Sequence, residues 1–282
     1  MSKMGEEENG GVYGKRNNKT QQQKGESKMK VKAIYLVALM VGVVALLAMS
    51  MPVCASKTDD RIESSAKKSY VFKTYLKDDD IKIQSKDGVV TLTGSVSEES
   101  HKSLAQETVA DLPGVKSVNN KLKVKGERPA ENSDTWVQMK VKTALLFHRN
   151  VSGFNTEIDV KDGIVTLRGE ATSEAQKDLT TEYAKDVEGV KDVKNEMTLA
   201  KTSVKPGKTV GEKVDDASIT AQVKMTLLYH RSTSALNTKV KTKDGVVTLS
   251  GKAKNAAEKE LATKFANDVK GVKSVKNQMT IE

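Results

Sequence analysis

The sequence is poor in the residues on which catalytic and metal sites depend. Its 282 residues include one cysteine, three histidines and one tryptophan, and aromatic residues make up 4%. A lone cysteine, Cys54, excludes an internal disulfide and a zinc site built from cysteines. His101, His148 and His230 lie far apart, with no second ligand at metal-binding spacing and no nucleophile and base paired nearby. We therefore expect no enzyme, no metal and no cofactor.

The glycines also fail to form a phosphate-binding loop, because no glycine-rich turn leads from a strand into a helix with the required spacing. With few aromatic side chains, any core must be built from Val, Leu, Ile and Ala. Such cores are thin, which favours small domains of modest stability.

The N-terminal region has the pattern of an export signal. Residues 1–28 are polar and are interpreted as an extension or a misannotated start. Residues 29–55 combine lysines, an uncharged run of 17 residues (33–49) and the small-residue site Val53-Cys-Ala55. The run is shorter than the roughly 20 residues of a spanning helix, so we predict a secretory signal peptide and a periplasmic location. The alternative is an uncleaved inner-membrane anchor at 33–49.

Three internal repeats define the rest of the chain. The hairpin motif Lys-Asp-Gly-Val/Ile-Val-Thr-Leu-x-Gly ends at Gly94, Gly169 and Gly251, which are 75 and 82 residues apart. Asp-Gly between apolar runs indicates a type I′ turn, whose two central residues need φ > 0. Other repeated residues keep the same two offsets, so we predict three small domains: domain 1 (59–124), domain 2 (134–199) and domain 3 (215–282).

Each repeat begins with the pattern of a helix. Apolar residues recur every four positions, as Ile62, Ala66 and Tyr70, then Val137, Val141 and Leu145, then Ile219, Val223 and Leu227. The aspartates Asp59, Asp134 and Asp216 are placed to cap these helices. A strand, the Asp-Gly turn and a second strand follow.

A second helix and a last strand complete each repeat. Ser173 and Asn255 begin capping boxes, and the second helix should bury Leu104, Leu179 and Leu261 before it stops at a glycine. Asn120, Asn195 and Asn277 in the last strand are interpreted as bonding backbone. The predicted class is α+β: three tandem domains, each helix–strand–strand–helix–strand, with two helices on a three-stranded sheet. The polar linkers 125–133 and 201–214 predict separate folding with relative motion.

The repeated motifs resemble the BON domain. The resemblance rests on the acidic helix start, the Asp-Gly hairpin and the endings Gly114-Val-Lys-Ser-Val-Asn-Asn120, Gly189-Val-Lys-Asp-Val-Lys-Asn195 and Gly271-Val-Lys-Ser-Val-Lys-Asn277. It covers nearly all of residues 59–282. The resemblance implies a non-enzymatic protein of envelope and osmotic stress, with phospholipid binding and chaperone-like activity as the family's associated functions.

Charge is shared unevenly among the domains. Domain 1 has 11 basic and 11 acidic residues, domain 2 has 9 and 12, and domain 3 has 12 and 7, a net charge of +5. Lys239, Lys241 and Lys243 alternate along one strand of domain 3 and should share one face. They are candidate contacts for anionic phospholipid. A solvated sheet face is the other explanation.

Trp136 is the second candidate lipid contact. It lies about 100° around its helix from the buried stripe, and indole favours the water–membrane boundary. The alternative is that it folds over its own domain. Two partner classes therefore compete: unfolded or outer-membrane proteins, bound in a chaperone-like way, and anionic phospholipid. The modest charge favours the first. No aromatic platform accompanies the lysines, so no nucleic-acid partner is predicted.

Overall fold

The computed structural model describes residues 54–151, 153, 155–200, 213–233 and 238–282, and Cys54–Glu282 forms one compact unit. The predicted extension 1–28, the alternative anchor 33–49 and nearly all of the predicted signal 29–55 lie outside the described residues. No helix among the described residues is long and apolar enough to cross a membrane.

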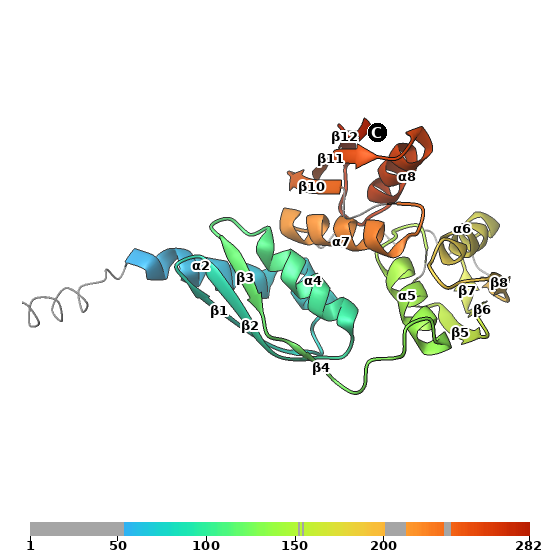
Figure 1. Ribbon diagram of the computed structural model, residues 1–282, viewed down its shortest axis with the longest axis horizontal. Helices are drawn as coiled ribbons and strands as arrows, with labels where there is room; N and C mark the ends of the chain where they lie inside the picture. Colours follow the sequence, from blue (N-terminus) through green and yellow to red (C-terminus); the bar gives the residue numbers. More distant parts are fainter. Residues whose placement is uncertain (1–53, 152, 154, 201–212, 234–237) are drawn as a thin grey trace, which may run out of the picture. The chain divides into compact units, whose positions relative to one another are not determined.

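The three repeats fold alike (Figure 1). Domain 1 contains α2 (Cys54–Lys68), α3 (Tyr70–Thr74), β1 (Asp80–Lys86), β2 (Val89–Val96), α4 (Glu99–Ala110), β3 (Ser117–Asn120) and β4 (Lys123–Val124). Domain 2 contains α5 (Asp134–Leu146), β5 (Glu157–Lys161), β6 (Ile164–Arg168), β7 (Glu170–Ala171), α6 (Glu174–Lys185), β8 (Asp192–Asn195) and β9 (Thr198–Leu199). Domain 3 contains α7 (Asp216–Tyr229), β10 (Thr238–Lys243), β11 (Val246–Ala253), α8 (Ala256–Asn267), β12 (Ser274–Asn277) and β13 (Thr280–Ile281).

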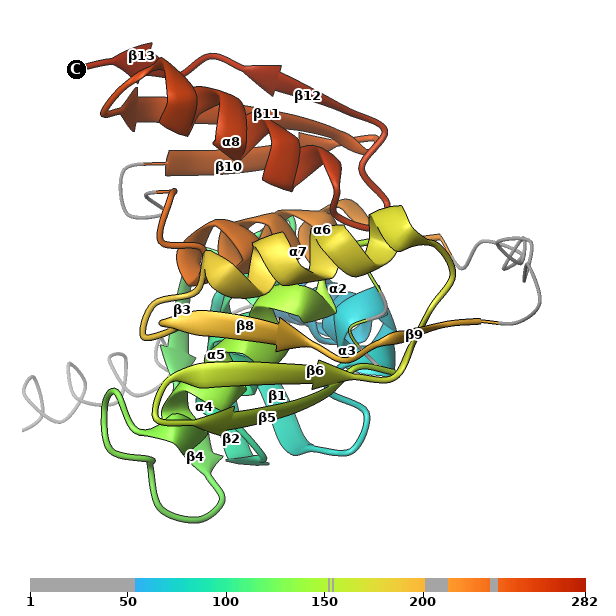
Figure 2. The ribbon, with the colours of Figure 1, turned by 90° about the vertical axis from the view of Figure 1, so that its right-hand side faces the viewer.

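The second strand of each hairpin is the centre of its sheet. β2 pairs antiparallel with β1 and parallel with β3, and β6 and β11 make the same two pairings in their domains. The second helix makes the crossover that a parallel pairing requires. Figure 2 shows this arrangement in domain 3, where α8 lies across β10, β11 and β12. The predicted α+β class, with helices on small sheets, is confirmed. The predicted three-stranded sheet gains a short fourth strand in domains 1 and 3, β4 and β13, and domain 2 adds a separate pair, β7 and β9.

The Asp-Gly turns have the predicted conformation. Asp162 and Gly163 have φ of 53° and 80°, and the other two turns match them closely. The prediction that the repeated aspartates cap the first helix is wrong. Asp134 Oδ1 and Oδ2 instead accept the turn's Gly163 and Asp162 N–H groups at 2.9 and 2.8 Å, and Ser133 caps α5. Asp59 and Asp216 bind their own turns in the same way.

Two further predictions about the helices need correction. The first helix of domain 1 begins at Cys54, ahead of Asp59, and breaks at Ser69, whose hydroxyl accepts from Phe72 N to start α3. Leu104 is buried as predicted, but Leu179 and Leu261 are half-buried. They line a cavity between α6 and α8, where Tyr183 and Phe265 fill the deeper positions.

The asparagines of the last strand have the predicted structural role. Asn195 Nδ2 donates to Lys177 O on α6 at 2.8 Å, and its Oδ1 accepts from Met197 N at 3.0 Å. Asn120 and Asn277 make the equivalent bonds in domains 1 and 3. Each asparagine therefore ties the sheet to the second helix.

The domains do not sit apart as the linkers predict. One apolar core runs through domains 2 and 3, and the second joins domain 1 to Phe147 of domain 2 and to one face of α7. α7 contacts α4 of domain 1, α5 of domain 2 and α8 and β10 of its own domain (Figure 1). Ten of its residues are buried, so it has little polar face left. The described residues of the three domains therefore form one compact unit, and separate folding with relative motion stays a prediction.

Candidate functional site

The three predicted lysines share one exposed strand face. Along β10, Lys239, Lys241 and Lys243 are exposed, and Val240 between them is buried under the helices. Lys241 also affects the pKa of Asp111 in domain 1. Burial raises the pKa of the Asp111 carboxyl, and the positive charges of Lys224 and Lys241 lower it, but by less. The prediction that the lysines lie on one face is correct.

Pairing between strands adds two lysines that sequence spacing alone does not bring together. Lys276 of β12 lies level with Thr248 of β11, which lies level with Lys241 of β10. Lys252 follows on β11, next to the buried Ala253. We call these five exposed lysines the basic sheet face: Lys239, Lys241, Lys243, Lys252 and Lys276. No described residue forms an ion pair with any of them.

The corresponding face of domain 2 is electrostatically balanced. Arg168 on β6 forms ion pairs with Asp159 on β5 at 2.6 Å and with Glu196 at 2.9 Å, and these raise its pKa. In domain 3, Ser250 stands where domain 2 has Arg168, and Lys241 stands where it has Asp159. The same fold therefore presents an ion-paired face in domain 2 and, in domain 3, lysines that form no ion pair with a described residue.

Trp136 lies elsewhere, on α5. Its ring is half-buried, and a Cβ placed on Gly189 of the same domain would come within 3.2 Å of it. Lys140 Nζ sits 3.9 Å from the ring centroid, a cation–π contact, and forms an ion pair with Glu188 at 2.6 Å. Trp136 thus packs over its own domain while one side of its ring stays accessible.

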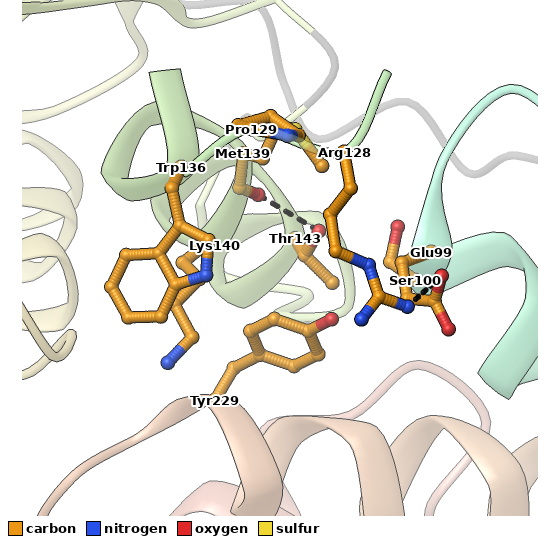
Figure 3. Close-up of a pocket in the computed structure, with 9 residues that line it drawn as sticks. All are labelled: Glu99, Ser100, Arg128, Pro129, Trp136, Met139, Lys140, Thr143 and Tyr229. Atoms are coloured by element: carbon orange, nitrogen blue, oxygen red, sulfur yellow. Dashed lines mark hydrogen bonds and ion pairs between the residues drawn. The ribbon is translucent and has the colours of Figure 1, made fainter. Parts of the chain in front are cut away.

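That accessible side lines a pocket of about 270 Å³ where the three domains meet (Figure 3). Its lining comes from α4 (Glu99, Ser100), from the linker (Arg128, Pro129), from α5 (Trp136, Met139, Lys140, Thr143) and from α7 (Tyr229). None of the lysines of the basic sheet face lines it. The two predicted contacts therefore belong to separate surfaces.

The pocket combines aromatic side chains with charged and hydroxyl groups. Figure 3 shows Trp136 and Tyr229 on one side, with Arg128 directed toward Glu99 on the other, at 2.8 Å. Burial, and then the charges of Glu98 and Glu99, raise the pKa of Tyr229 to about 12. Its hydroxyl therefore stays neutral, and no described residue forms a hydrogen bond with it. Sequence spacing does not reveal Tyr229, because α7 has no polar face to set it apart.

The described residues contain no cluster of histidine, cysteine and carboxylate groups that could hold a metal ion. His148 and His230 follow the first helices of domains 2 and 3, and both are buried between these two domains. The structure therefore gives these two residues a setting that their sequence positions do not indicate.

Comparison with known proteins agrees with this architecture. The BON domain model matches residues 58–126, 133–201 and 215–282. Osmotically-inducible protein Y of Escherichia coli (strain K12) is 36% identical over 146 residues, which are 52% of this chain and 71% of that protein. An uncharacterized protein in the gshII 5′ region of Anaplasma centrale is 30% identical over 142 residues, 50% of this chain and 90% of that protein.

Among solved structures, the chain is similar to CdsD, a structural protein of the type III secretion system of Chlamydia trachomatis. The identity is 17%, the match covers 78% of this chain and 90% of that one, and the TM-score is 0.22. A likeness at this level carries no argument about function.

Proposed function

Because the chain belongs to the BON domain family, we propose that it is a non-enzymatic periplasmic protein of the osmotic stress response that binds anionic phospholipid headgroups through the basic sheet face. The similarity to osmotically-inducible protein Y supports the link to osmotic stress. The export signal predicted at residues 29–55 supports the periplasm.

The observation that carries the lipid proposal is the uncompensated charge of the basic sheet face. Its five lysines project from three paired strands with no carboxylate among the outward positions of those strands. Each lysine near an anionic surface contributes about 1 kcal/mol before screening, so five correspond to a dissociation constant of roughly 0.2 mM. Binding of that strength is reversible and depends on ionic strength.

Vesicle sedimentation tests this proposal. The full chain should bind phosphatidylglycerol vesicles at low salt, bind phosphatidylcholine vesicles far less, and lose affinity as the Debye length falls to about 8 Å. Changing Lys239, Lys241 and Lys243 together to Gln should weaken binding by about two orders of magnitude, because three of five charges are lost.

A matched triple variant separates the site from net charge. Lys82, Lys86 and Lys123 lie exposed on the sheet of domain 1, and changing all three to Gln removes the same charge. That variant should keep most of the vesicle binding. Equal loss in both triple variants, or binding that is indifferent to salt, would contradict a lipid site on domain 3.

The Trp136 pocket favours a second candidate, the chaperone-like function. Its volume suits one apolar side chain of an unfolded client, with Trp136 and Tyr229 as the contact surfaces. The large apolar residues exposed elsewhere among the described residues are scattered singly over the three domains: Val89, Leu199, Leu228 and Ile281. A chaperone-like activity would therefore depend on the pocket.

An aggregation assay distinguishes this candidate. If the pocket holds clients, Trp136→Ala should lose most of the protection of reduced insulin against aggregation. Leu199→Ala should keep it, because that exposed residue does not line the pocket. Client binding should also shift the emission of Trp136, the chain's one tryptophan. Equal protection by both variants would show that the pocket does not hold the client.

A further inference from the structure

Domains 2 and 3 contact each other through equivalent segments, one from each domain. His148 bridges Val269 and His230 bridges Val187, both antiparallel. His230 and Val269 lie 82 residues after His148 and Val187, so the two bridges occupy equivalent positions in the repeat. Arg149 N donates to Asp268 O at 2.7 Å, and Arg231 N donates to Asp186 O at 2.8 Å, as the same relation requires. Such reciprocal contacts are typical of a two-fold dimer, here formed within one chain.

Two imidazoles meet at the centre of this contact. His148 Nε2 lies 2.9 Å from His230 Nε2, and both side chains are fully buried. His148 stacks on Tyr183 and His230 stacks on Phe265, with ring centroids 3.9 and 4.2 Å apart. Domain 1 has Lys73 in place of the histidine and Thr108 in place of Tyr183, so it lacks this arrangement.

The other ring nitrogen of each histidine faces a carboxylate. His148 Nδ1 lies 3.0 Å from Asp268 Oδ2, and His230 Nδ1 lies 3.3 Å from Asp186 Oδ2. The second contact is not a hydrogen bond, because neither of its atoms meets hydrogen-bond geometry with any described residue. The Asp268 carboxylate assigns the tautomer of His148: Nδ1 carries a hydrogen, so Nε2 is free to accept one from His230.

This geometry limits how many protons the pair can hold. A neutral imidazole has one N–H and one acceptor nitrogen, whereas an imidazolium has two N–H groups and no acceptor. A 2.9 Å contact between two Nε2 atoms needs a hydrogen on one of them only. If both histidines were protonated, two N–H groups would point at each other across 2.9 Å, a separation that leaves no room for a water molecule between them. The closed contact therefore excludes the doubly protonated pair.

The surrounding charged groups do not remove this limit. Asp268 also accepts from Tyr183 Oη at 2.8 Å and from Asn150, and Asp186 accepts from Ser232 and has Arg231 at 3.7 Å. The Arg149 guanidinium binds the Val269 and Val272 carbonyls at the end of α8. Glu182, Lys185 and Lys264 line the cavity alongside. Both carboxylates thus have other donors already, and two cations lie close to the histidines.

The pKa of His148 is lowered, which also disfavours its protonation in the closed contact. Burial lowers it, the hydrogen bond with Asp268 opposes this, and the nearby His230 lowers it further. The ordinary pKa of histidine in an unfolded or open chain is about 6.5. The closed state therefore binds fewer protons than the open state, so its stability is lost as the pH falls through about 6.5 and below.

We propose that the His148–His230 contact makes the pairing of domains 2 and 3 acid-sensitive: entry of the second proton separates the two imidazoles, loosens the domains and exposes the apolar surface around Tyr183 and Phe265. This inference does not depend on lipid binding. A protein outside the cytoplasmic membrane would in this way acquire new apolar surface when its surroundings turn acidic.

The test follows the full chain from pH 7.5 to pH 5.0. The fluorescence of the apolar dye 8-anilinonaphthalene-1-sulfonate should rise several-fold below pH 6.5, with an unchanged far-UV circular dichroism spectrum. His230→Gln should remove the rise, because a glutamine amide can turn its oxygen toward a protonated His148. His101→Gln is the matched control: His101 pairs with Asp79 in domain 1, so this variant should retain the full response.

A proton NMR titration of the three histidines covers the case in which His230→Gln does not fold at pH 7.5. In the unmodified chain, the resonances of His148 and His230 should shift together in one step that coincides with the rise in dye fluorescence. Independent titration of the two histidines near pH 6.5 would overturn the proposal. So would a flat dye signal down to pH 5.0, or a rise that persists in His230→Gln.

Discussion

Domain 3 is held by its two neighbours in physically different ways. Domain 2 meets it through equivalent segments, around two histidines and two carboxylates. Domain 1 meets it through one face of α7, where apolar side chains pack against the core of domain 1: Ala217, Ala221 and Met225. The first contact has buried histidines at its centre, whereas the second combines close packing with ion pairs from Lys224 to Glu107 and Asp111 at 3.0 and 3.1 Å.

The difference shows how one fold acquires separate interfaces. α7 buries Ile219, Val223 and Leu227 in the core that domain 3 shares with domain 2, which leaves its opposite face for domain 1. Around that face, Asp215 Oδ2 accepts from Tyr70 N at 2.8 Å and Ser218 Oγ from Val71 N at 3.1 Å. These bonds satisfy backbone groups at the start of α3. Domain 1 should therefore be released by damage to packing, and domain 2 by protons.

The largest effect is expected from a charge placed in the contact with domain 1. Ala221 is fully buried, so Ala221→Asp puts an unpaired carboxylate against the core of domain 1 and costs about 3–5 kcal/mol. Because the side chain faces away from the core that domain 3 shares with domain 2, urea unfolding should split into two phases. Trp136 packs on Gly189 of domain 2 and also lines the pocket with domain 1, so its fluorescence should report both phases.

Leu228→Asp is the control for this experiment. Leu228 lies on the same helix but is 51% exposed, so its carboxylate stays solvated and the unfolding curve should change little. A single unshifted transition for Ala221→Asp would show that the face of α7 toward domain 1 is not a close-packed contact.

The repeated core of each domain could be predicted from the sequence because it depends on local patterns. Alternation places Val90 and Leu92 on one face of a strand, and both are fully buried. The Asp-Gly turns follow from the same local chemistry, since φ is positive at both residues. Because these patterns recur in all three repeats, each occurrence supports the prediction made for the others.

The contacts between domains could not be predicted in this way. Nothing in the spacing of α7 shows that Ala221 and Met225 meet another domain, because small and apolar residues on a second face look like ordinary helix formers. His148 and His230 are 82 residues apart, and only the folded chain brings their Nε2 atoms together. Lys276 joins the basic sheet face through strand register, which a single strand does not reveal.

Two matched tyrosines compare the contact with domain 2 directly with the contact with domain 1, and they give the smallest expected effect. Tyr183 Oη donates to Asp268 Oδ2 at 2.8 Å beside the histidines, and Tyr75 Oη donates to Gln222 Oε1 at 3.3 Å in the contact with domain 1. Both side chains are buried. Burial, and then the Asp268 charge, raises the pKa of Tyr183 well above its usual value, so its hydroxyl remains a donor at neutral pH.

Replacing each tyrosine with Phe should therefore give unequal losses of unfolding free energy. Tyr183→Phe should cost about 1.5–3 kcal/mol, because its acceptor is a buried carboxylate, and Tyr75→Phe about 0.5–1.5 kcal/mol, because its acceptor is a neutral amide. Chemical denaturation at pH 7.5 measures both. The acid response should differ as well: Tyr183→Phe should shift its midpoint, since Asp268 then binds His148 without competition, and Tyr75→Phe should leave it unchanged. Equal losses and equal midpoints would mean that the buried carboxylate and the histidines add no specific stability to the contact with domain 2.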